Sequence, residues 1–133
     1  MLLSPDPMHI PNGFLNFGVT LVTWVLTILA LGYALHRASK DLDERKIPLV
    51  GVLAAAIFAG QMLNFAVAGG TSGHLMGAAI ATILLGPWPA MLAMTCVVAI
   101  QALVFQDGGL VVLGANVLNM GIIGVLVSYA VYL

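Results

Sequence analysis

The residues of this chain that could do chemistry are few, and its three histidines are the most informative. His9 precedes the first long apolar run, His74 follows a glycine-rich break, and His36 lies beside a charged stretch. Imidazole is a good ligand for late first-row metals. His9 and His74 are therefore candidate metal ligands. The competing interpretation is that each is an ordinary polar residue at the end of an apolar segment.

The composition places these histidines in a membrane protein. Of 133 residues, 62% are hydrophobic and 7% are charged, whereas a soluble domain is about a quarter charged. The apolar runs are continuous, without the alternation of a transmembrane β-barrel, and a lipid-exposed backbone must satisfy its own hydrogen bonds. The sequence therefore predicts an all-α integral membrane protein. The net charge of -1 gives no reason to expect a nucleic-acid partner.

The apolar runs predict a bundle of about five transmembrane helices. Turn residues and prolines separate the runs, and the expected helices are 17–35, 49–67, 74–85, 90–105 and 110–133. The first run has the length that a bilayer crossing requires. The third and fourth are short, so a re-entrant hairpin is the alternative to two spans. We favour two spans, because the prolines and tryptophan of 86–89 are typical of an interfacial turn.

The charge distribution predicts the topology. All four lysines and arginines lie in residues 37–46, which the positive-inside rule assigns to the cytoplasmic side. Alternation then puts the N-terminus and residues 69–73 outside. His9 and His74 fall on this outer side, and His36 falls on the opposite one. A haem site with His36 and His74 as axial ligands is thereby excluded. The pair His9 and His74 satisfies the same test, although His9 lies on a loop.

An enzyme is the rival class on the same residues. Residues 70–73, G-T-S-G, fit the pattern around the nucleophile of intramembrane serine proteases. That chemistry needs a histidine on a later helix to activate the serine, and none follows His74. Residues 70–73 are also a typical turn. We therefore expect a protein that is not an enzyme.

Several separated blocks resemble one known family. They are residues 8–16 (MHIPNGFLN), 70–77 (GTSGHLMG), the turn 85–88 (LGPW), 106–109 (QDGG) and 114–121 (GANVLNMG). In this order they resemble the CbiM/NikM family, the substrate-binding membrane subunits of energy-coupling-factor transporters for cobalt and nickel. The resemblance runs from Met8 to the end of the chain.

The resemblance implies a metal site formed by the N-terminal segment, residues 8–16, folding back into the helix bundle. Its implied ligands are the amino nitrogen of Met8, the backbone and imidazole nitrogens of His9, and His74. Nitrogen ligands suit Co²⁺ or Ni²⁺ better than Mg²⁺ or Ca²⁺. The ion would be a transported substrate and not a catalytic cofactor. Thr71, Ser72, Asn116 and Asn119 are candidates for orienting the ligands.

The resemblance also implies partners. These are a transmembrane coupling subunit, two cytoplasmic ABC-type ATPase subunits and a small accessory membrane subunit, in a prokaryotic plasma membrane. The chain has no nucleotide-binding motif of its own. A cobalt system would supply cobalamin synthesis, and a nickel system would supply urease or hydrogenase. The hypothesis from another class is a structural or assembly membrane protein without a ligand.

The expected organisation is one transmembrane substrate-capture domain, 1–133. Residues 1–7 are an extension, 8–16 bind metal and 17–133 form helices. Seven residues precede Met8. A free amine there requires translation to start at Met8 or the extension to be removed, and otherwise the coordination differs. Family members are longer than this chain, which is therefore expected to be a fragment or a split subunit lacking the C-terminal helices.

Overall fold

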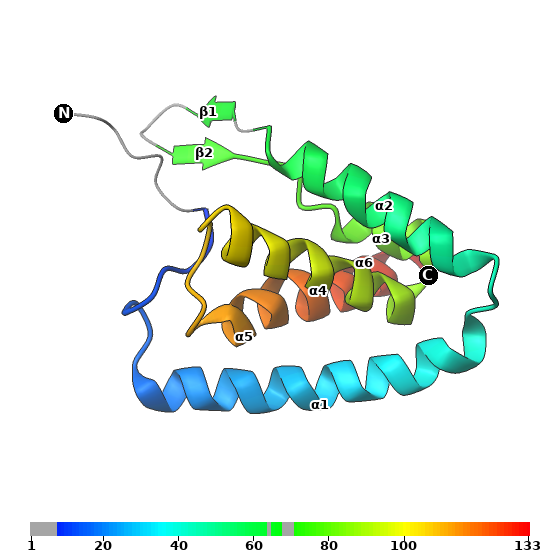
Figure 1. Cartoon of the computed structure of the whole chain (residues 1–133), viewed down its shortest axis with the longest axis horizontal. Helices are drawn as coiled ribbons and strands as arrows, with labels where there is room; N and C mark the ends of the chain where they lie inside the picture. The colour runs from blue at the N-terminus through cyan, green and yellow to red at the C-terminus, as the bar shows by residue number, and fades with distance from the viewer. Residues whose placement is uncertain (1–7, 64, 68–70) are drawn as a thin grey trace.

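The computed structural model describes residues 8–63, 65–67 and 71–133, and helices dominate it (Figure 1). The elements in chain order are α1 (Phe17–Asp41), α2 (Lys46–Gln61), β1 (Phe65–Val67), β2 (Thr71–Gly73), α3 (Ala78–Leu85), α4 (Pro87–Val104), α5 (Leu113–Asn116), the π-helical η1 (Val117–Ile123) and α6 (Gly124–Tyr132). The last three follow one another without a break, so α5, η1 and α6 form a single long helix. The predicted all-α bundle, with the N-terminal segment folded back onto it, is confirmed.

Helix α1 begins at the predicted residue, Phe17, but is longer than predicted. The side chain of Asn16 accepts a hydrogen bond from the Val19 amide at 2.9 Å, which satisfies one of the free amides at the helix start. The helix passes residue 35 and ends at Asp41. Its 25 residues span about 37 Å. The charged residues after 35 extend the helix because alanine, arginine and lysine favour helix as strongly as the apolar residues before them.

The second predicted helix, 49–67, was wrong at its end. Helix α2 stops at Gln61, and residues 65–67 instead form strand β1, which pairs antiparallel with β2. Phe65 lies opposite Gly73 in this hairpin. Phenylalanine and valine before the glycines, and threonine after them, favour strands. The glycine-rich stretch that predicted only a turn therefore connects two strands.

The third predicted helix, 74–85, was wrong at its start. Helix α3 begins at Ala78, after Gly77, whose φ of +76° ends the extended stretch from β2. Its eight residues span about 12 Å, so α3 is too short to cross a bilayer alone. Within the described residues, three helices have the length and composition of a span: α1, α4 and the continuous helix from Leu113 to Tyr132.

Helix α4 lies at the centre of the bundle and packs against α1, α2, α3 and η1. Small residues allow this close approach between helices. Gly114 packs directly on Trp24 of α1, and Gly124 packs on Ala78 of α3. The large apolar side chains of the core include Ile57, Met91, Met94, Val97, Val98, Met120, Ile122 and Val125. Large apolar side chains also cover the outside, as on the 17–41 helix, which suits a lipid environment.

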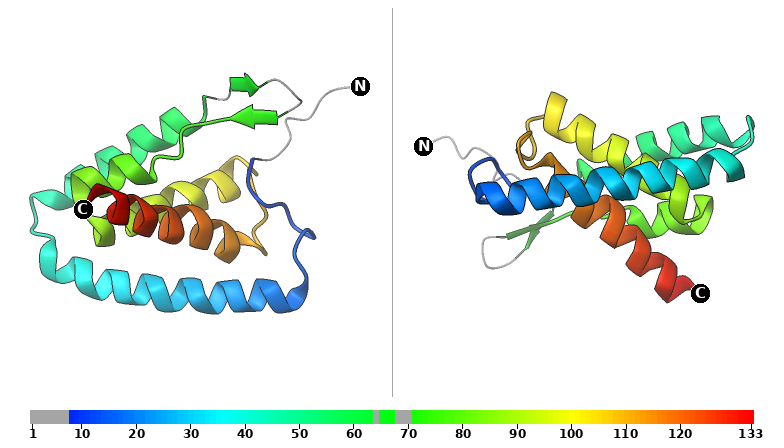
Figure 2. Two further views of the ribbon diagram at one scale, coloured as in Figure 1. Left: turned by 180° about the vertical axis from the view of Figure 1, so that it is seen from behind. Right: turned by 90° about the horizontal axis from the view of Figure 1, so that it is seen from below.

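The two ends of the bundle differ in character. The N-terminal segment, the β1–β2 hairpin and the α4–α5 connection gather at one end in both views of Figure 2, and the α1–α2 connection lies at the other. The positively charged stretch, 37–46, belongs to this second end. The fold therefore places the segments that carry His9 and His74 together, away from His36.

Candidate metal centre

The N-terminal segment is fastened to the bundle through the backbone of Ile10. The Asn116 side chain accepts from the Ile10 amide at 2.9 Å and donates to the Ile10 carbonyl at 3.1 Å. The Gly109 amide donates to the same carbonyl at 2.9 Å. Asn116 is buried, and buried amides need such partners. One asparagine on the long C-terminal helix thus fixes the residue that follows His9.

A second attachment lies two residues further along. The Asn12 side chain accepts from the Val111 amide at 3.0 Å. Gly109 packs so closely on Asn12 that a β-carbon at position 109 would overlap it. The 106–109 turn is therefore shaped to receive the N-terminal segment, which explains why glycine is required there.

His9 and the nitrogen of Met8 meet at one carboxylate. The Met8 amide donates to Asp107 Oδ1 at 2.9 Å, and His9 Nδ1 lies 3.2 Å from Asp107 Oδ2. The His9 side chain is 1% exposed. Neither Nδ1 nor Nε2 of the ring has a hydrogen-bond partner among the residues that the structure describes, so the approach of Nδ1 to Asp107 is close but is not a hydrogen bond. Buried polar atoms are nearly always paired, so the two unpaired ring nitrogens make His9 a candidate ligand.

Gly108 forms the wall of the site beside His9. Its φ is +103°, and a β-carbon built on it would lie 2.8 Å from the His9 β-carbon and 3.1 Å from Asn116 Nδ2. Any side chain at position 108 would therefore push against both the ring and its anchor.

The ring of His74 is oriented by its own backbone. His74 Nδ1 lies 2.9 Å from the Leu75 carbonyl oxygen. A carbonyl only accepts hydrogen bonds, so Nδ1 carries the proton of the neutral ring and Nε2 keeps its lone pair. Metal-binding histidines are commonly fixed in this way. Nε2 is thereby the His74 nitrogen that is left free to accept a ligand.

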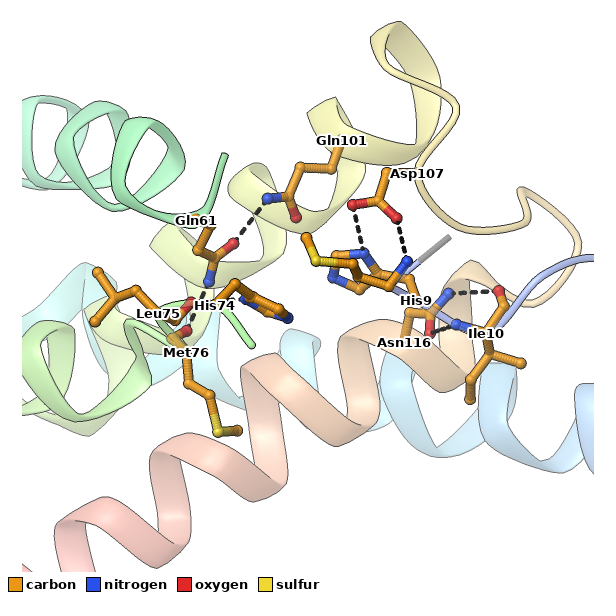
Figure 3. Close-up of polar contacts among 10 residues, drawn as sticks. His9, Ile10, Gln61, His74, Leu75, Met76, Gln101, Asp107 and Asn116 are labelled. Carbon is orange, nitrogen blue, oxygen red and sulfur yellow. Dashed lines mark hydrogen bonds and ion pairs between the residues drawn. The ribbon is translucent and has the colours of Figure 1, made fainter. Parts of the chain in front are cut away.

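The two rings come close enough to share one ion. Their centroids are 6.1 Å apart and their planes are tilted by 44° (Figure 3). With metal–nitrogen bonds of about 2.1 Å and ring centres about 1.1 Å beyond the nitrogens, two imidazoles on opposite sides of an ion have centroids about 6.4 Å apart. At right angles on one ion the separation falls to about 4.5 Å. The observed distance lies between these limits, so the separation of the two rings is compatible with a shared ion.

The side chains alone do not complete a metal site. Across the described part of the chain, no three histidine, cysteine, aspartate or glutamate side chains are grouped to hold an ion. The ligand set implied by the resemblance contains only two such side chains, those of His9 and His74. Its other members are main-chain nitrogens. Of these, the Met8 nitrogen contacts the same carboxylate as His9 Nδ1, that of Asp107.

The structure separates the residues expected to orient the ligands. Asn116 is hydrogen-bonded to the backbone of Ile10, the residue after His9, whereas Asn119 is exposed and borders a groove between α3 and α6. The side chains of Thr71 and Ser72 lie outside the described residues, and with them the serine of the protease-like pattern. Asp107 was missed as a site residue, because the 106–109 block was interpreted as a turn. The sequence did contain an indication of its importance, because Asp107 is the single charged residue after position 46, and isolated charges in membrane proteins are commonly functional.

The structure defines a class, a helical bundle with three apolar helices long enough to cross a membrane and two histidine rings close together at one end, and comparison with known proteins specifies the family. Residues 9–133 match the family model described as the cobalt uptake substrate-specific transmembrane region. The chain belongs to this family.

Individual relatives agree with the family assignment. NikMN of Archaeoglobus fulgidus is 50% identical over 125 residues, covering 94% of this chain and 41% of the relative. The fused nickel transport protein NikMN of Rhodobacter capsulatus is 41% identical over 125 residues, covering 94% of this chain and 36% of the relative. A crystal structure described as a truncated transition metal transporter superposes with a TM-score of 0.86 at 37% identity, covering 94% of this chain and 58% of that one. The chain thus spans between 36% and 58% of the length of these proteins.

Proposed function

We propose that this chain is the substrate-capture part of a Co²⁺ or Ni²⁺ uptake transporter. The observation that carries the proposal is the convergence of His9 and His74, whose ring centroids lie 6.1 Å apart although the residues are far apart in sequence. The ion would be held by the Met8 nitrogen, by backbone and imidazole nitrogens of His9, and by Nε2 of His74. Membership of a cobalt uptake family supports the same function.

The proposed ligands explain the arrangement around Asp107. Its two oxygens face the Met8 nitrogen and His9 Nδ1, which are two of the proposed ligands. The carboxylate therefore keeps both nitrogens side by side, and an ion bound to them would compete with this contact. Metal binding to nitrogen ligands displaces their protons, and Asp107 is the nearest described carboxylate for them.

The state of the N-terminus decides the coordination. A Met8 that begins the chain offers an amine, whereas a Met8 that follows Pro7 offers a peptide nitrogen, which binds metals only after losing its proton. Residues 1–7 lie outside the described residues. We propose that the functional form begins at Met8. Mass spectrometry of the purified membrane protein measures this directly.

The proposed transporter needs partners and an orientation. We propose that the end carrying His9 and His74 faces outward in a prokaryotic plasma membrane, because the opposite end carries residues 37–46 with all the lysines and arginines. A transmembrane coupling subunit, two ATPase subunits and a small accessory membrane subunit would supply energy and movement. Cobalt for cobalamin synthesis is the proposed destination. Nickel for urease or hydrogenase is the alternative, because the same nitrogen ligands accept both ions.

Metal titration of the purified chain, prepared to begin at Met8, tests the proposal. We expect binding of Co²⁺ or Ni²⁺ at micromolar concentration or below, and a loss of at least about 100-fold for His74→Ala, since a first ligand contributes more than the residues that orient it. His36→Ala is the matched control, because His36 is an exposed histidine near the C-terminal end of α1, where the chain leads into α2. A chain that binds neither ion would support the structural or assembly role instead.

A further inference from the structure

Two glutamine side chains form a buried pair inside the bundle. Gln61, the last residue of α2, and Gln101, near the end of α4, are both completely buried. Gln101 Nε2 donates to Gln61 Oε1 at 2.8 Å. Neither glutamine was singled out from the sequence, and neither belongs to the ligands proposed above. We call them the amide pair.

The amide pair is bonded to the segment that carries His74. Gln61 Nε2 donates to the Met76 carbonyl at 2.6 Å. Met76 lies two residues after His74 and directly before Gly77, where the chain turns into α3. Gly77 packs against the Gln61 amide, 3.4 Å from a β-carbon built at 77. The stretch from His74 to Gly77 is therefore held against α2.

The amide pair is also connected to the other half of the site. The backbone carbonyl of Gln101 accepts from the Asp107 amide at 3.1 Å, and Asp107 faces both Met8 and His9. Figure 3 shows Gln101 between Gln61 and Asp107. Hydrogen bonds thus link the Met76 carbonyl to Gln101 through the Gln61 side chain, and the backbone of Gln101 is bonded to the backbone of Asp107.

Stability alone does not account for this pair. Removing amide groups from water costs free energy, and the hydrogen bonds that they form inside the protein only roughly offset this cost. Apolar side chains of similar size would fill the same space without it. Moreover, Gln101 Oε1 is buried without a hydrogen-bond partner among the described residues. Polar groups kept in a core under these conditions commonly specify one arrangement of the surrounding elements.

We propose that the amide pair positions His74 relative to His9 and so sets the affinity of the site for its ion. This inference rests on the proposed function, because it concerns the same metal site. Gln61 and Gln101 are positioning residues that touch no ion. They hold the backbone next to His74 at a fixed position beside the end of α4. The two rings are therefore already within reach of one ion before it binds. No binding free energy has to be spent on ordering the segment that carries His74.

Three variants test the inference: Gln61→Met, Gln101→Met and the double variant. Each single variant leaves buried polar groups of its neighbour unpaired, so we expect both lower thermal stability and a loss of metal affinity of about 10- to 100-fold. The double variant replaces both amides with apolar side chains of similar length. We expect it to regain stability relative to Gln61→Met while its affinity for Ni²⁺ stays reduced.

The matched control is Thr27→Val. Thr27 is buried and donates to the Gly114 carbonyl at 2.7 Å, so this change also removes a buried hydrogen bond between helices, but away from His74. We expect lower stability with unchanged Ni²⁺ affinity. The visible spectrum of bound Co²⁺, which reports its ligand geometry, is expected to change in the double variant and to stay as in the wild type for Thr27→Val.

The outcomes separate the two proposals. If the wild-type chain binds no metal, the proposed function fails, and with it the site that the amide pair would serve. If the wild-type chain binds and His74→Ala does not, but the double variant binds with wild-type affinity and an unaltered Co²⁺ spectrum, the positioning role is wrong and the proposed function stands.

Discussion

Replacing Gly108 by alanine gives the sharpest test of how the N-terminal segment forms the site. The change affects two things at once. The backbone at 108 has a φ of +103°, and an added β-carbon would lie 2.8 Å from the His9 β-carbon. Carbon atoms in contact prefer about 3.5–4.0 Å. His9, whose anchor Asn116 lies 3.1 Å from the same point, would have to move by about 1 Å.

The magnitude follows from these two effects. A side chain in this backbone conformation costs about 1–3 kcal/mol. The chain can relieve the cost by releasing the N-terminal segment from the 106–109 turn, which removes His9 from the site. If the substitution favours the released segment by about 2 kcal/mol, the apparent affinity for Ni²⁺ drops by about 30-fold. Calorimetric titration of the wild-type and variant chains measures this ratio.

A glycine elsewhere provides the control. Gly86, between α3 and α4, has a φ of +80°, and a β-carbon built on it meets no atom within 4 Å. Gly86→Ala therefore introduces comparable backbone strain without touching the site, and we expect reduced thermal stability with unchanged Ni²⁺ affinity. The reasoning would be refuted by a Gly108→Ala chain that binds like the wild type, or by an equal loss of affinity in Gly86→Ala.

Two further predictions concern the elements that support the site. Asn116→Leu removes all the side-chain hydrogen bonds to Ile10, so titration should show a loss of Ni²⁺ affinity of about 10- to 100-fold, whereas Asn119→Leu, at an exposed position, should bind normally. Gly114→Ala would place a β-carbon 2.8 Å from the Trp24 ring, so thermal unfolding should show a loss of stability of about 1–3 kcal/mol from overpacking. The control is Gly32→Ala on α1, where a β-carbon meets nothing within 4 Å, and this variant should lose no stability. Equal losses in both variants would contradict the packing argument.

The sequence was sufficient to bring His9 and His74 together. Apolar runs and one charged stretch predicted two membrane crossings between His9 and His74, and alternation then placed both histidines on the same side. The structure confirms this placement, with centroids 6.1 Å apart. Physical constraints made the prediction possible, because bilayer thickness and the positive-inside rule restrict the topology strongly.

The ends of the helices on either side of the hairpin could not be predicted from the sequence pattern. Residues 65–67 are apolar and directly follow an apolar helix, so periodicity cannot distinguish a continued helix from a strand. The difference depends on pairing with residues 71–73 across a turn, which is a tertiary property. The start of α3 was missed for a similar reason, because a glycine such as Gly77 reveals its positive φ only in the folded chain.

The supporting polar residues were the least predictable. Gln61 and Gln101 lie in two different apolar helices and are 40 positions apart in the sequence. No feature of the sequence around either residue identifies the other as its partner. Asp107 was visible as an isolated charge, but its contacts with Met8 and His9 depend on the N-terminal segment folding back. Sequence patterns therefore indicated which residues could bind metal and did not indicate which residues hold them in place.

The attachment of the N-terminal segment has a consequence for how the protein is made. Met8 bonds to Asp107 and Ile10 bonds to Asn116, partners 99 and 106 positions further along the chain. At a synthesis rate of about 5–20 residues per second, Met8 waits about 5–20 s on the ribosome before Asp107 exists. The contacts of Met8 and Ile10 therefore form only after about a hundred further residues have been synthesised. During that interval the segment that carries His9 lacks the partners that hold it in the folded chain.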